Sequence, residues 1–260
     1  MTAAIRSLRG GDYASAIVAE LVSAGIANGE ACRKRLTEQG DLLKGDDHSA
    51  VFLVELAGQR CYCKLFLAKS RRQSLLFRLA RSRGQRSFDV ASRLSALGLP
   101  VPLPLACLGL PGAVLFATEV VPGRDLKACW QAQPQADDWP AALTASGRAL
   151  AALHDAGFSH GDTKWSNLIW DGSDVTLVDL DAVRRSADRS RRARDLARFT
   201  LNAEEMGVPG ARYEHFLHSY QVASGESRAT LEKATLRALK PLRRRHLKRY
   251  GPRGHRLLGE

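Results

Sequence analysis

Three polar side chains stand close together in the segment His160–Asn167, whose sequence is HGDTKWSN. Asp162 is a carboxylate, Lys164 a cation and Asn167 an amide. Phosphoryl transfer needs a carboxylate that orients the attacking hydroxyl and accepts its proton, a cation at the transferred phosphate, and oxygen ligands for Mg²⁺. We therefore expect one loop to surround the reaction centre, with Asp162 and Lys164 as catalytic residues, Asn167 as a metal ligand and ATP as the phosphoryl donor.

A β-hairpin is predicted directly after Asn167. Leu168–Trp170 and Val175–Val178 contain β-forming residues, and the intervening Asp171–Asp174 is typical of a turn. Asp179 follows the second strand, so the hairpin would hold Asp179 opposite Asn167. Two oxygen ligands suit Mg²⁺, which keeps waters and nucleotide oxygens in its remaining positions. The metal ligands expected from the sequence are therefore Asn167 and Asp179.

This segment partly matches the protein-kinase signature H-R-D-L-x-x-x-N followed by D-F-G. Gly161 stands where that signature has arginine, and Asp181 stands where it has the last glycine. Because the arginine can receive an activation-loop phosphate in protein kinases, we expect no regulation by loop phosphorylation. The alternative is that these are ordinary turn residues, since Asp, Asn and Gly collect in loops through local hydrogen bonds.

Upstream sequence supplies a context for the kinase interpretation. Ala50–Ala57 and Arg60–Phe66 are predicted strands joined by a turn at Gly58–Gln59, and their alternation places Tyr62 and Lys64 on one face. A kinase of this kind needs a lysine on a strand before the catalytic loop, where it meets the α and β phosphates. Lys64 is the candidate.

Two further features bear on the nucleotide half. Leu43–Ser49 precedes the strands, and its Gly45 could allow a close approach of the backbone to phosphates. Arg86–Leu97 is predicted to be a helix, because its apolar residues recur at helical spacing. Asp89 is its only acid. Either Asp89 replaces the glutamate expected to pair with Lys64, or the lysine is held in another way.

Ala113–Val120 is a predicted strand that leads into Val121–Gly123, where a change in composition indicates a hinge. Adenine is expected against the backbone from Glu119 to Val121. Ile169, directly after the amide ligand, could cover the adenine from the other side. The alternative for Val121 and Ile169 is plain core, which is the more frequent role of such apolar residues.

The length and composition favour one two-lobed protein. A chain of 260 residues with 45% hydrophobic content can bury a sizeable core. The predicted division is an N-terminal helical extension over residues 1–42 that packs on the N-lobe, an N-lobe over 43–120 and a C-lobe over 121–260. Within the extension, residues 13–25 are predicted to form an amphipathic helix.

Cysteine usage and hydropathy bear on localisation. The five cysteines are odd in number, scattered and without C-x-x-C spacing, so no disulfide and no zinc site are expected. A reducing cytoplasm fits this pattern best. Neither a signal pattern nor an apolar run of about 18 residues is present, so we expect neither secretion nor a membrane span.

The net charge is strongly positive. Lys and Arg number 39 against 27 Asp and Glu, which leaves +12, gathered in Lys69–Arg86, Arg184–Arg194 and Lys240–Arg256. Each tract could be a solvated face, but an excess this large also favours an anionic partner. No nucleic acid is expected, because no binding motif for it is present. A basic last helix ending in Leu257–Leu258 predicts peripheral contact with the anionic inner face of the cytoplasmic membrane.

From about Leu43 to Phe199 the chain resembles the bacterial lipopolysaccharide kinase family. The resemblance rests on LKGDDHSAVFLVELAGQRCYCKLF, on a helix ending in GLPVP before a strand, on HGDTKWSN and VDLD, and on RDLARF. It implies an α+β, bilobal protein-kinase-like fold with a small β-rich N-lobe and a larger, mainly α-helical C-lobe. It also implies ATP and Mg²⁺ as cofactors, and a heptose or Kdo hydroxyl of a membrane-held lipopolysaccharide inner core as the acceptor.

Residue roles follow from this resemblance. They are Asp162 as the catalytic base, Lys64 as the phosphate-binding lysine, Asn167 and Asp179 as Mg²⁺ ligands, and Asp195 as a buried brace for the catalytic loop. Some heptose kinases of the family have tyrosine and histidine where Lys164 and Asn167 stand, so the acceptor sugar stays open.

Three other functions compete with this interpretation. A small-molecule kinase of the aminoglycoside or choline type shares the H-G-D loop, but acids are scarce in the C-terminal third of this chain. A protein kinase would show an A-P-E motif after Asp181, and none follows. A pseudokinase binding module is favoured by the missing helix glutamate and by Asp181. Retention of Lys64, Asp162 and Asn167 argues against it.

Overall fold

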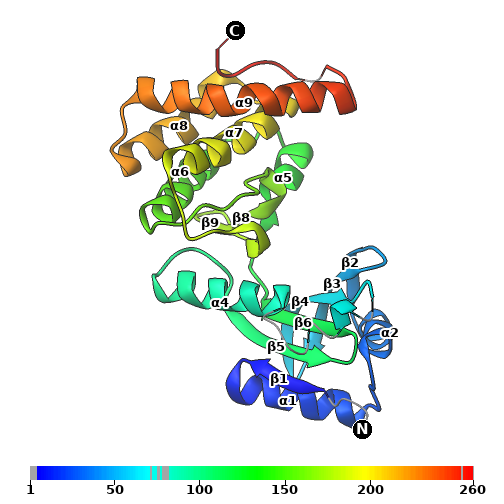
Figure 1. The fold of residues 1–260 in the computed structure, drawn as a ribbon. Helices are drawn as coiled ribbons and strands as arrows, with labels where there is room; N and C mark the ends of the chain where they lie inside the picture. Colours follow the sequence, from blue (N-terminus) through cyan, green and yellow to red (C-terminus); the bar gives the residue numbers. More distant parts are fainter. Residues whose placement is uncertain (1–4, 71, 75–76, 78–81, 253, 260) are drawn as a thin grey trace. The chain divides into compact units, whose positions relative to one another are not determined.

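The computed structural model describes residues 5–70, 72–74, 77, 82–252 and 254–259. The chain divides into two units, the first comprising residues 1–96 and 102–120 and the second 97–101 and 121–260. The first unit is built on a β-sheet and the second is mainly helical (Figure 1). This arrangement confirms the predicted α+β fold class, with a β-rich first part and a helical second part.

A six-stranded antiparallel sheet forms the centre of the first unit, in the order β1-β5-β6-β4-β3-β2. The strands are β1 Arg6–Arg9, β2 Asp41–Gly45, β3 Ser49–Leu56, β4 Gln59–Leu67, β5 Pro104–Leu110 and β6 Ala113–Glu119. The three strands predicted from the sequence are thus observed as β3, β4 and β6. Strand β1 lies in the segment predicted as a helical extension, and it pairs with β5 at the edge of the sheet.

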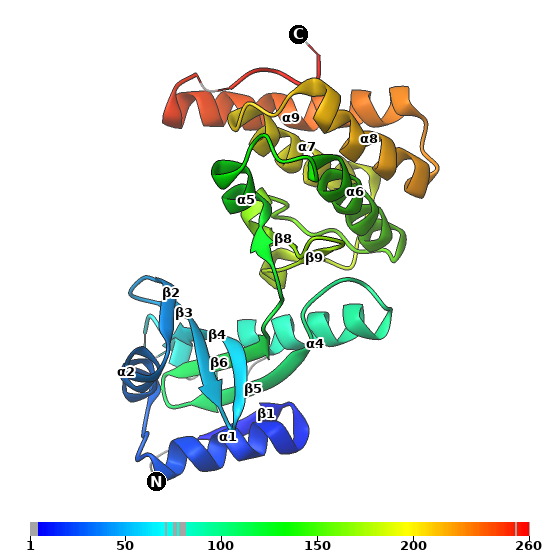
Figure 2. The same ribbon diagram turned by 180° about the vertical axis from the view of Figure 1, so that it is seen from behind.

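Helices cover both faces of this sheet: α1 (Gly11–Ser23), α2 (Gly29–Gln39) and α4 (Arg83–Ala96). Alternation along β4 sends Cys63 and Leu65 into a core that also contains Ile17 of α1 and Leu36 of α2. Helix α4 packs against the opposite face, where the rings of Phe88 and Phe116 meet edge-on at 6.4 Å between centroids. Figure 2 shows these helices from behind. The predicted helices 13–25 and 86–97 are therefore present with slightly shifted bounds.

The second unit combines a small sheet with a set of helices. The sheet has the order β7-β8-β9, with β7 Arg124–Asp125, β8 Leu168–Trp170 and β9 Val175–Leu177. The helices are α5 Leu126–Ala132, α6 Trp139–Asp155, α7 Arg189–Glu205, α8 Gly210–Ser224 and α9 Arg228–Tyr250, with short 3-10 turns η1 Trp165–Asn167 and η2 Leu180–Ala182. The predicted hairpin around Asp171–Asp174 is thus observed as β8 and β9.

Aromatic side chains fill the core of the second unit around Trp165. Its ring stacks on Trp139 of α6 at 5.9 Å and lies 5.3 Å from Phe199 of α7. Phe199 in turn stacks on Phe216 of α8 at 3.7 Å. Such pairs contribute roughly 0.5–1.5 kcal/mol beyond the burial of their area. Because Trp165 is fully buried, this core anchors the segment that begins at His160.

The C-terminal prediction was wrong in one respect. Helix α9 ends at Tyr250, and Leu257–Leu258 lie beyond it rather than within it. The N–H of Leu257 donates to the carboxylate of Glu204 at 2.9 Å, and Arg243 donates to the carbonyl of Leu258 at 2.7 Å. The side chain of Leu258 is buried. These interactions hold the segment on the protein, so Leu258 is not presented to a membrane.

Helices α6 and α8 approach closely at Gly147. A Cβ added there would lie 2.5 Å from the carbonyl oxygen of Phe216 and would also collide with Ser219. Neither neighbour can move without shifting α8, because the first is backbone and the second is held by a hydrogen bond to Phe216.

In the described part of the chain, no helix has the length and apolar character needed to cross a bilayer.

We expect Gly147→Ala to lower the free energy of unfolding by about 1–3 kcal/mol, the usual cost of overpacking a core. The measurement is urea denaturation followed by circular dichroism. Gly210→Ala is the matched control, because a Cβ at Gly210 of α8 would meet nothing within 4 Å. Equal losses in the two variants would contradict the close approach of α6 and α8.

Candidate active site

Asp162 lies at the centre of a charged cluster in the second unit. One carboxylate oxygen, Oδ2, contacts Nζ of Lys164 at 2.8 Å and accepts from Nδ2 of Asn167 at 3.1 Å. The other oxygen, Oδ1, accepts from Nη1 of Arg198 on α7 at 3.3 Å. The structure thus brings Asp162, Lys164 and Asn167 together, as the sequence predicts, and adds Arg198.

These contacts set the ionisation of Asp162. Partial burial by itself would raise the pKa of this carboxyl group, but Lys164, Arg198 and Asn167 favour the charged form more strongly. The pKa of Asp162 is therefore lowered from its ordinary value. The carboxylate is ionised at neutral pH, which is the state that can accept a proton.

Asn167 presents an oxygen for a cation. Its Nδ2 donates to the backbone oxygen of Asp162 at 2.9 Å as well as to the carboxylate. Because a carbonyl oxygen can only accept, the amide nitrogen must lie on that side, and Oδ1 faces the other way. The donor set of a hard oxygen ligand close to a carboxylate fits Mg²⁺.

The β8–β9 hairpin places Asp179 beside Asn167. The N–H of Val178 donates to the backbone oxygen of Asn167 at 3.0 Å, and Asp179 follows directly. Asp179 has φ 58° and ψ 59°, a left-handed conformation that is uncommon for a residue other than glycine. Strain of this kind collects at functional sites. Among the described residues, no group of three or more His, Cys, Asp and Glu gathers as at an all-protein metal site.

His160 links the hairpin to the loop. Its Nε2 is 3.1 Å from the carbonyl oxygen of Val178, and its Nδ1 accepts from the N–H of Asp162 at 3.3 Å. The first contact requires a proton on Nε2 and the second requires a bare Nδ1, so the ring is the neutral Nε2–H tautomer. Burial lowers the pKa of His160, against the opposing effect of Asp195. A neutral, structural histidine is the result.

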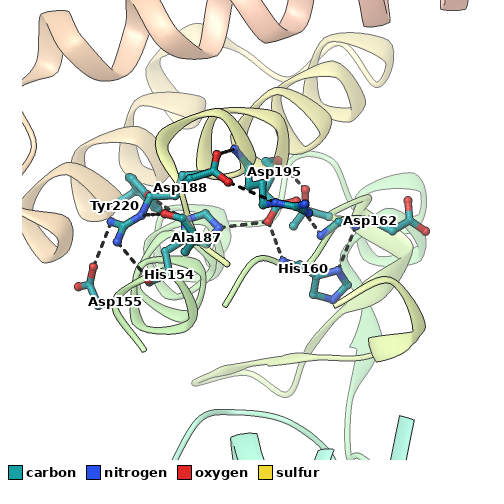
Figure 3. Close-up of polar contacts among 12 residues, drawn as sticks. His154, Asp155, His160, Asp162, Ala187, Asp188, Asp195 and Tyr220 are labelled. Atoms are coloured by element: carbon teal, nitrogen blue, oxygen red, sulfur yellow. Dashed lines mark hydrogen bonds and ion pairs between the residues drawn. The ribbon is translucent and has the colours of Figure 1, made fainter. Parts of the chain in front are cut away.

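Asp195 of α7 holds the backbone of the loop. Its carboxylate accepts from the N–H of His160 at 2.7 Å and from the N–H of Gly161 at 2.8 Å, and its side chain is 1% exposed. Nε2 of His154 lies 3.1 Å from the same carboxylate. Figure 3 shows Asp195 between His154 on one side and the loop with Asp162 on the other. The predicted brace is confirmed.

A second tier of contacts supports the brace. Nδ1 of His154 is 2.8 Å from the hydroxyl of Tyr220 on α8, and Arg192 donates to the carbonyl of His154 at 3.1 Å. Nη1 of the same Arg192 guanidinium pairs with Asp155 at 3.3 Å. These residues were not predicted, because they come from α6, α7 and α8 and share no local sequence pattern.

Gly161 is explained by its surroundings. It has φ 81°, and a Cβ there would lie 2.8 Å from the carbonyl oxygen of Ala182. A side chain would therefore meet both conformational strain and a collision with backbone. This is the physical reason why glycine stands at a position where the protein-kinase signature has arginine.

The remaining predicted residues lie on separate elements. Lys64 is on β4, on the face covered by α4, with Nζ 5.4 Å from the ring of Phe66. Asp89, the suggested partner of Lys64, accepts from Nε of Arg9 at 3.0 Å. Gly45 ends β2 and pairs with Ala50.

The turn after Gly45 is closed by hydrogen bonds from its amide groups to the side chain of Asp46. Asp46 accepts from the N–H groups of His48 and Ser49 at 2.7 and 2.8 Å, and these bonds lower the pKa of Asp46. Gly45 does not have a positive φ. The turn is thus closed by a side chain, so the two amides are engaged rather than open to a phosphate.

Residues predicted near adenine are found at the end of β6 and in β8. Oε1 of Glu119 accepts from the N–H of Leu103 at 2.9 Å. The side chain is thus engaged, so a contact of Glu119 with adenine would come from its backbone. Val121 is the next but one residue and begins the main part of the second unit. Ile169 is half-buried in β8, paired with Thr176.

Arg198 is the functional candidate that sequence reasoning missed. It lies three residues after Asp195 on α7, and residues three apart share one face of a helix. Asp195 accepts hydrogen bonds from the backbone of the loop, and Arg198 contacts the carboxylate of Asp162 in the same loop. The spacing within RDLARF could have suggested this, once Asp195 was assigned to the loop.

A prediction concerns Gly161. We expect Gly161→Ala to destabilise the protein by more than Gly157→Ala, because the two glycines have similar φ values of 81° and 83°, and only Gly161 has a neighbour within 4 Å. The left-handed conformation costs about 1–2 kcal/mol in both variants, and overpacking adds about 1–3 kcal/mol at Gly161. Thermal and urea unfolding of the two variants measure the difference. Indistinguishable stabilities would rule out the contact with Ala182.

The chain is similar to known proteins in sequence. Residues 37–220 match the model of the lipopolysaccharide kinase (Kdo/WaaP) family. A 3-deoxy-D-manno-octulosonic acid kinase of Actinobacillus succinogenes is 29% identical over 159 residues, which cover 55% of this chain and 65% of that protein. The match therefore spans a little under two thirds of the relative's length. Since the family model covers most of the chain, including the loop of Asp162 and its brace, this protein belongs to the lipopolysaccharide kinase (Kdo/WaaP) family.

Proposed function

We propose that this protein is an ATP-dependent kinase that transfers the γ-phosphate to a sugar hydroxyl of the lipopolysaccharide inner core. The observation that carries the proposal is the cluster in which the Asp162 carboxylate contacts Lys164, Asn167 and Arg198. Family membership supports the reaction class. The similarity to a 3-deoxy-D-manno-octulosonic acid kinase makes that sugar the first acceptor to test, before heptose.

In this mechanism Asp162 orients the attacking hydroxyl and accepts its proton. Two cations and an amide lower its pKa, so it is a weak base. A weak base suffices when the transition state is loose and bond formation to the attacking oxygen is little advanced. The role of Asp162 is therefore mainly to position the hydroxyl, and the Asp195 brace fixes the backbone from which it acts.

Lys164 and Arg198 supply positive charge where the phosphoryl group is transferred. Both side chains are 41% exposed, so they can leave the carboxylate for a phosphate oxygen. Asn167 and Asp179 would hold Mg²⁺, and Lys64 would meet the phosphates of ATP. When bound, Mg²⁺ neutralises charge on the nucleotide phosphates. Gly45, Glu119, Val121 and Ile169 remain proposals for the nucleotide site.

We further propose that the protein works at the inner face of the cytoplasmic membrane, where its glycolipid acceptor would be held. The net charge of +12 supports this location, because anionic lipids attract basic surfaces. The side chain of Leu258 would not contribute to this attraction, because it is buried.

We expect Asp162→Asn to reduce kcat for phosphoryl transfer by about 10²–10⁴-fold, the usual contribution of a positioned base. Transfer of labelled γ-phosphate from ATP with Mg²⁺ to a dephosphorylated inner-core glycolipid measures it. Asp174→Asn is the matched control, because Asp174 lies exposed in the β8–β9 turn of the same unit.

The same assay tests the competing functions. An aminoglycoside and a protein substrate are included as acceptors. Label on the core sugar that depends on Asp162 supports the proposal, and label only on the aminoglycoside would replace it with a small-molecule kinase. Full activity of Asp162→Asn would remove Asp162 from the mechanism.

A pH prediction follows from the pairing of Lys164 with Asp162. Lys164 favours the ionised carboxylate, so Lys164→Gln should raise the pKa of Asp162. Because the ionised form accepts the proton, the acid limb of the kcat/KM profile should move to higher pH in the variant. If the acid limb stayed at the wild-type pH, Lys164 would not control the pKa of Asp162, even if the substitution changed kcat.

A further inference from the structure

A groove of about 750 Å³ lies in the second unit between α7 and α9. It is lined by Arg189, Ser190, Ala193, Arg194, Arg198, Lys233, Ala234, Arg237, Ala238, Pro241, Leu242 and Arg245. The lining contains arginines and a lysine, but no acid. Alanines along both helices leave room between them.

The cations of the groove come from two facing rows. Arg194 and Arg198 are four residues apart on α7, and Lys233, Arg237 and Arg245 follow the same spacing on α9, with Pro241 between them. Residues four apart lie on one face of a helix. Helices α7 and α9 pack against each other, as Figure 1 also shows. The two rows therefore line opposite walls.

Several cations of α7 and α9 that lie outside the groove are neutralised by acids. Arg192 pairs with Asp155, Arg228 with Glu214 and Arg243 with Glu204. Among the residues that the structure describes, Arg194 and Arg237 make no ion pair, and neither do the other groove cations Arg189, Lys233 and Arg245. Like charges four residues apart on a helix repel each other. Unneutralised cations in one groove thus fit an anionic ligand better than a role in folding.

One residue of the groove also belongs to the catalytic cluster. Arg198 lines the groove and also donates to the carboxylate of Asp162 at 3.3 Å. Asp162 is where the acceptor hydroxyl is held in the proposed mechanism. A molecule bound in the groove is therefore next to the group that receives the phosphate.

We propose that this groove binds the carboxylate and phosphate groups of the acceptor glycolipid and so positions its sugar hydroxyl at Asp162. The inference rests on the proposed function. Arginine suits such groups, because its guanidinium forms paired hydrogen bonds with carboxylate and phosphate. The similar kinase acts, by its name, on a sugar acid, which would itself carry one such group. Arg198 connects the groove to Asp162, and Arg194, Arg237, Lys233 and Arg245 supply further cations of the site.

The test compares two double variants with equal changes of charge. Arg194→Glu/Arg237→Glu alters the groove, whereas Lys240→Glu/Arg244→Glu alters exposed residues of α9 outside it. Isothermal titration calorimetry without ATP measures binding of deacylated lipopolysaccharide core, and a coupled assay measures the KM values. We expect the groove variant to raise the Kd and KM for the core at least about tenfold, the loss of a charge-assisted contact. The control and the KM for ATP should stay unchanged.

Two modified acceptors identify the group that is bound. If phosphates of the core fill the groove, phosphatase treatment should weaken wild-type binding and remove the difference between the proteins. If the sugar carboxylate fills the groove, reduction of the carboxyl group should weaken wild-type binding and remove the difference between the proteins. The wild-type affinity should fall with added salt, and the dependence should be weaker in the groove variant.

Other results would overturn the inference. Equal affinities of the two double variants for the core would exclude the groove as the binding site of the core. The two double variants could instead bind the core as the wild type does but lose binding to phosphatidylglycerol vesicles equally. The basic residues would then form a general membrane surface. Because binding is measured without turnover, an inactive wild type that still shows the difference would refute the proposed kinase reaction and leave the groove as an anion site.

Discussion

The carboxylate of Asp195 is the interaction on which the active-site loop depends. A buried carboxylate is unfavourable unless donors surround it, and here the N–H groups of His160 and Gly161 and the ring of His154 provide them. These bonds fix the loop backbone from inside the helical unit. Asp162 can therefore point outward from a rigid base while its own side chain stays partly exposed. Positioning and reactivity are thus divided between two aspartates.

Helix α7 connects the parts of the second unit. Its buried face carries Asp195 and Phe199, which hold the loop and the aromatic core. A neighbouring face carries Arg194 and Arg198, which line the groove. Because both faces belong to one rigid helix, the brace that fixes Asp162 also fixes the distance from Asp162 to the basic groove. In our proposal the same element therefore orients the catalytic group and the acceptor.

The arginine-rich composition has two different uses in this unit. Arg192, Arg228 and Arg243 are paired with acids and hold helices or the C-terminal segment in place. Arg194 and Arg237 lie in the groove without an acidic partner among the described residues. Charge counting alone could not separate these groups, since the paired Arg192 and the unpaired Arg194 lie in the same basic tract, Arg184–Arg194. Pairing depends on which helices face each other, and this distinguishes structural cations from those available to a ligand.

Features that depend on neighbouring residues could be predicted before the fold was known. Strand alternation predicted β3 and β4 with Lys64 on one face, the turn residues predicted the β8–β9 hairpin, and the HGDTKWSN spacing predicted that Asp162, Lys164 and Asn167 share one loop. Features that depend on contacts between distant segments became clear only from the folded chain. Arg198 approaches Asp162 because α7 packs against the loop, and glycine is needed at position 161 because Ala182 lies against it. Leu258 is buried because its segment binds Arg243 and Glu204. Local propensity acts over a few residues, whereas packing and pairing join residues that the chain order keeps far apart.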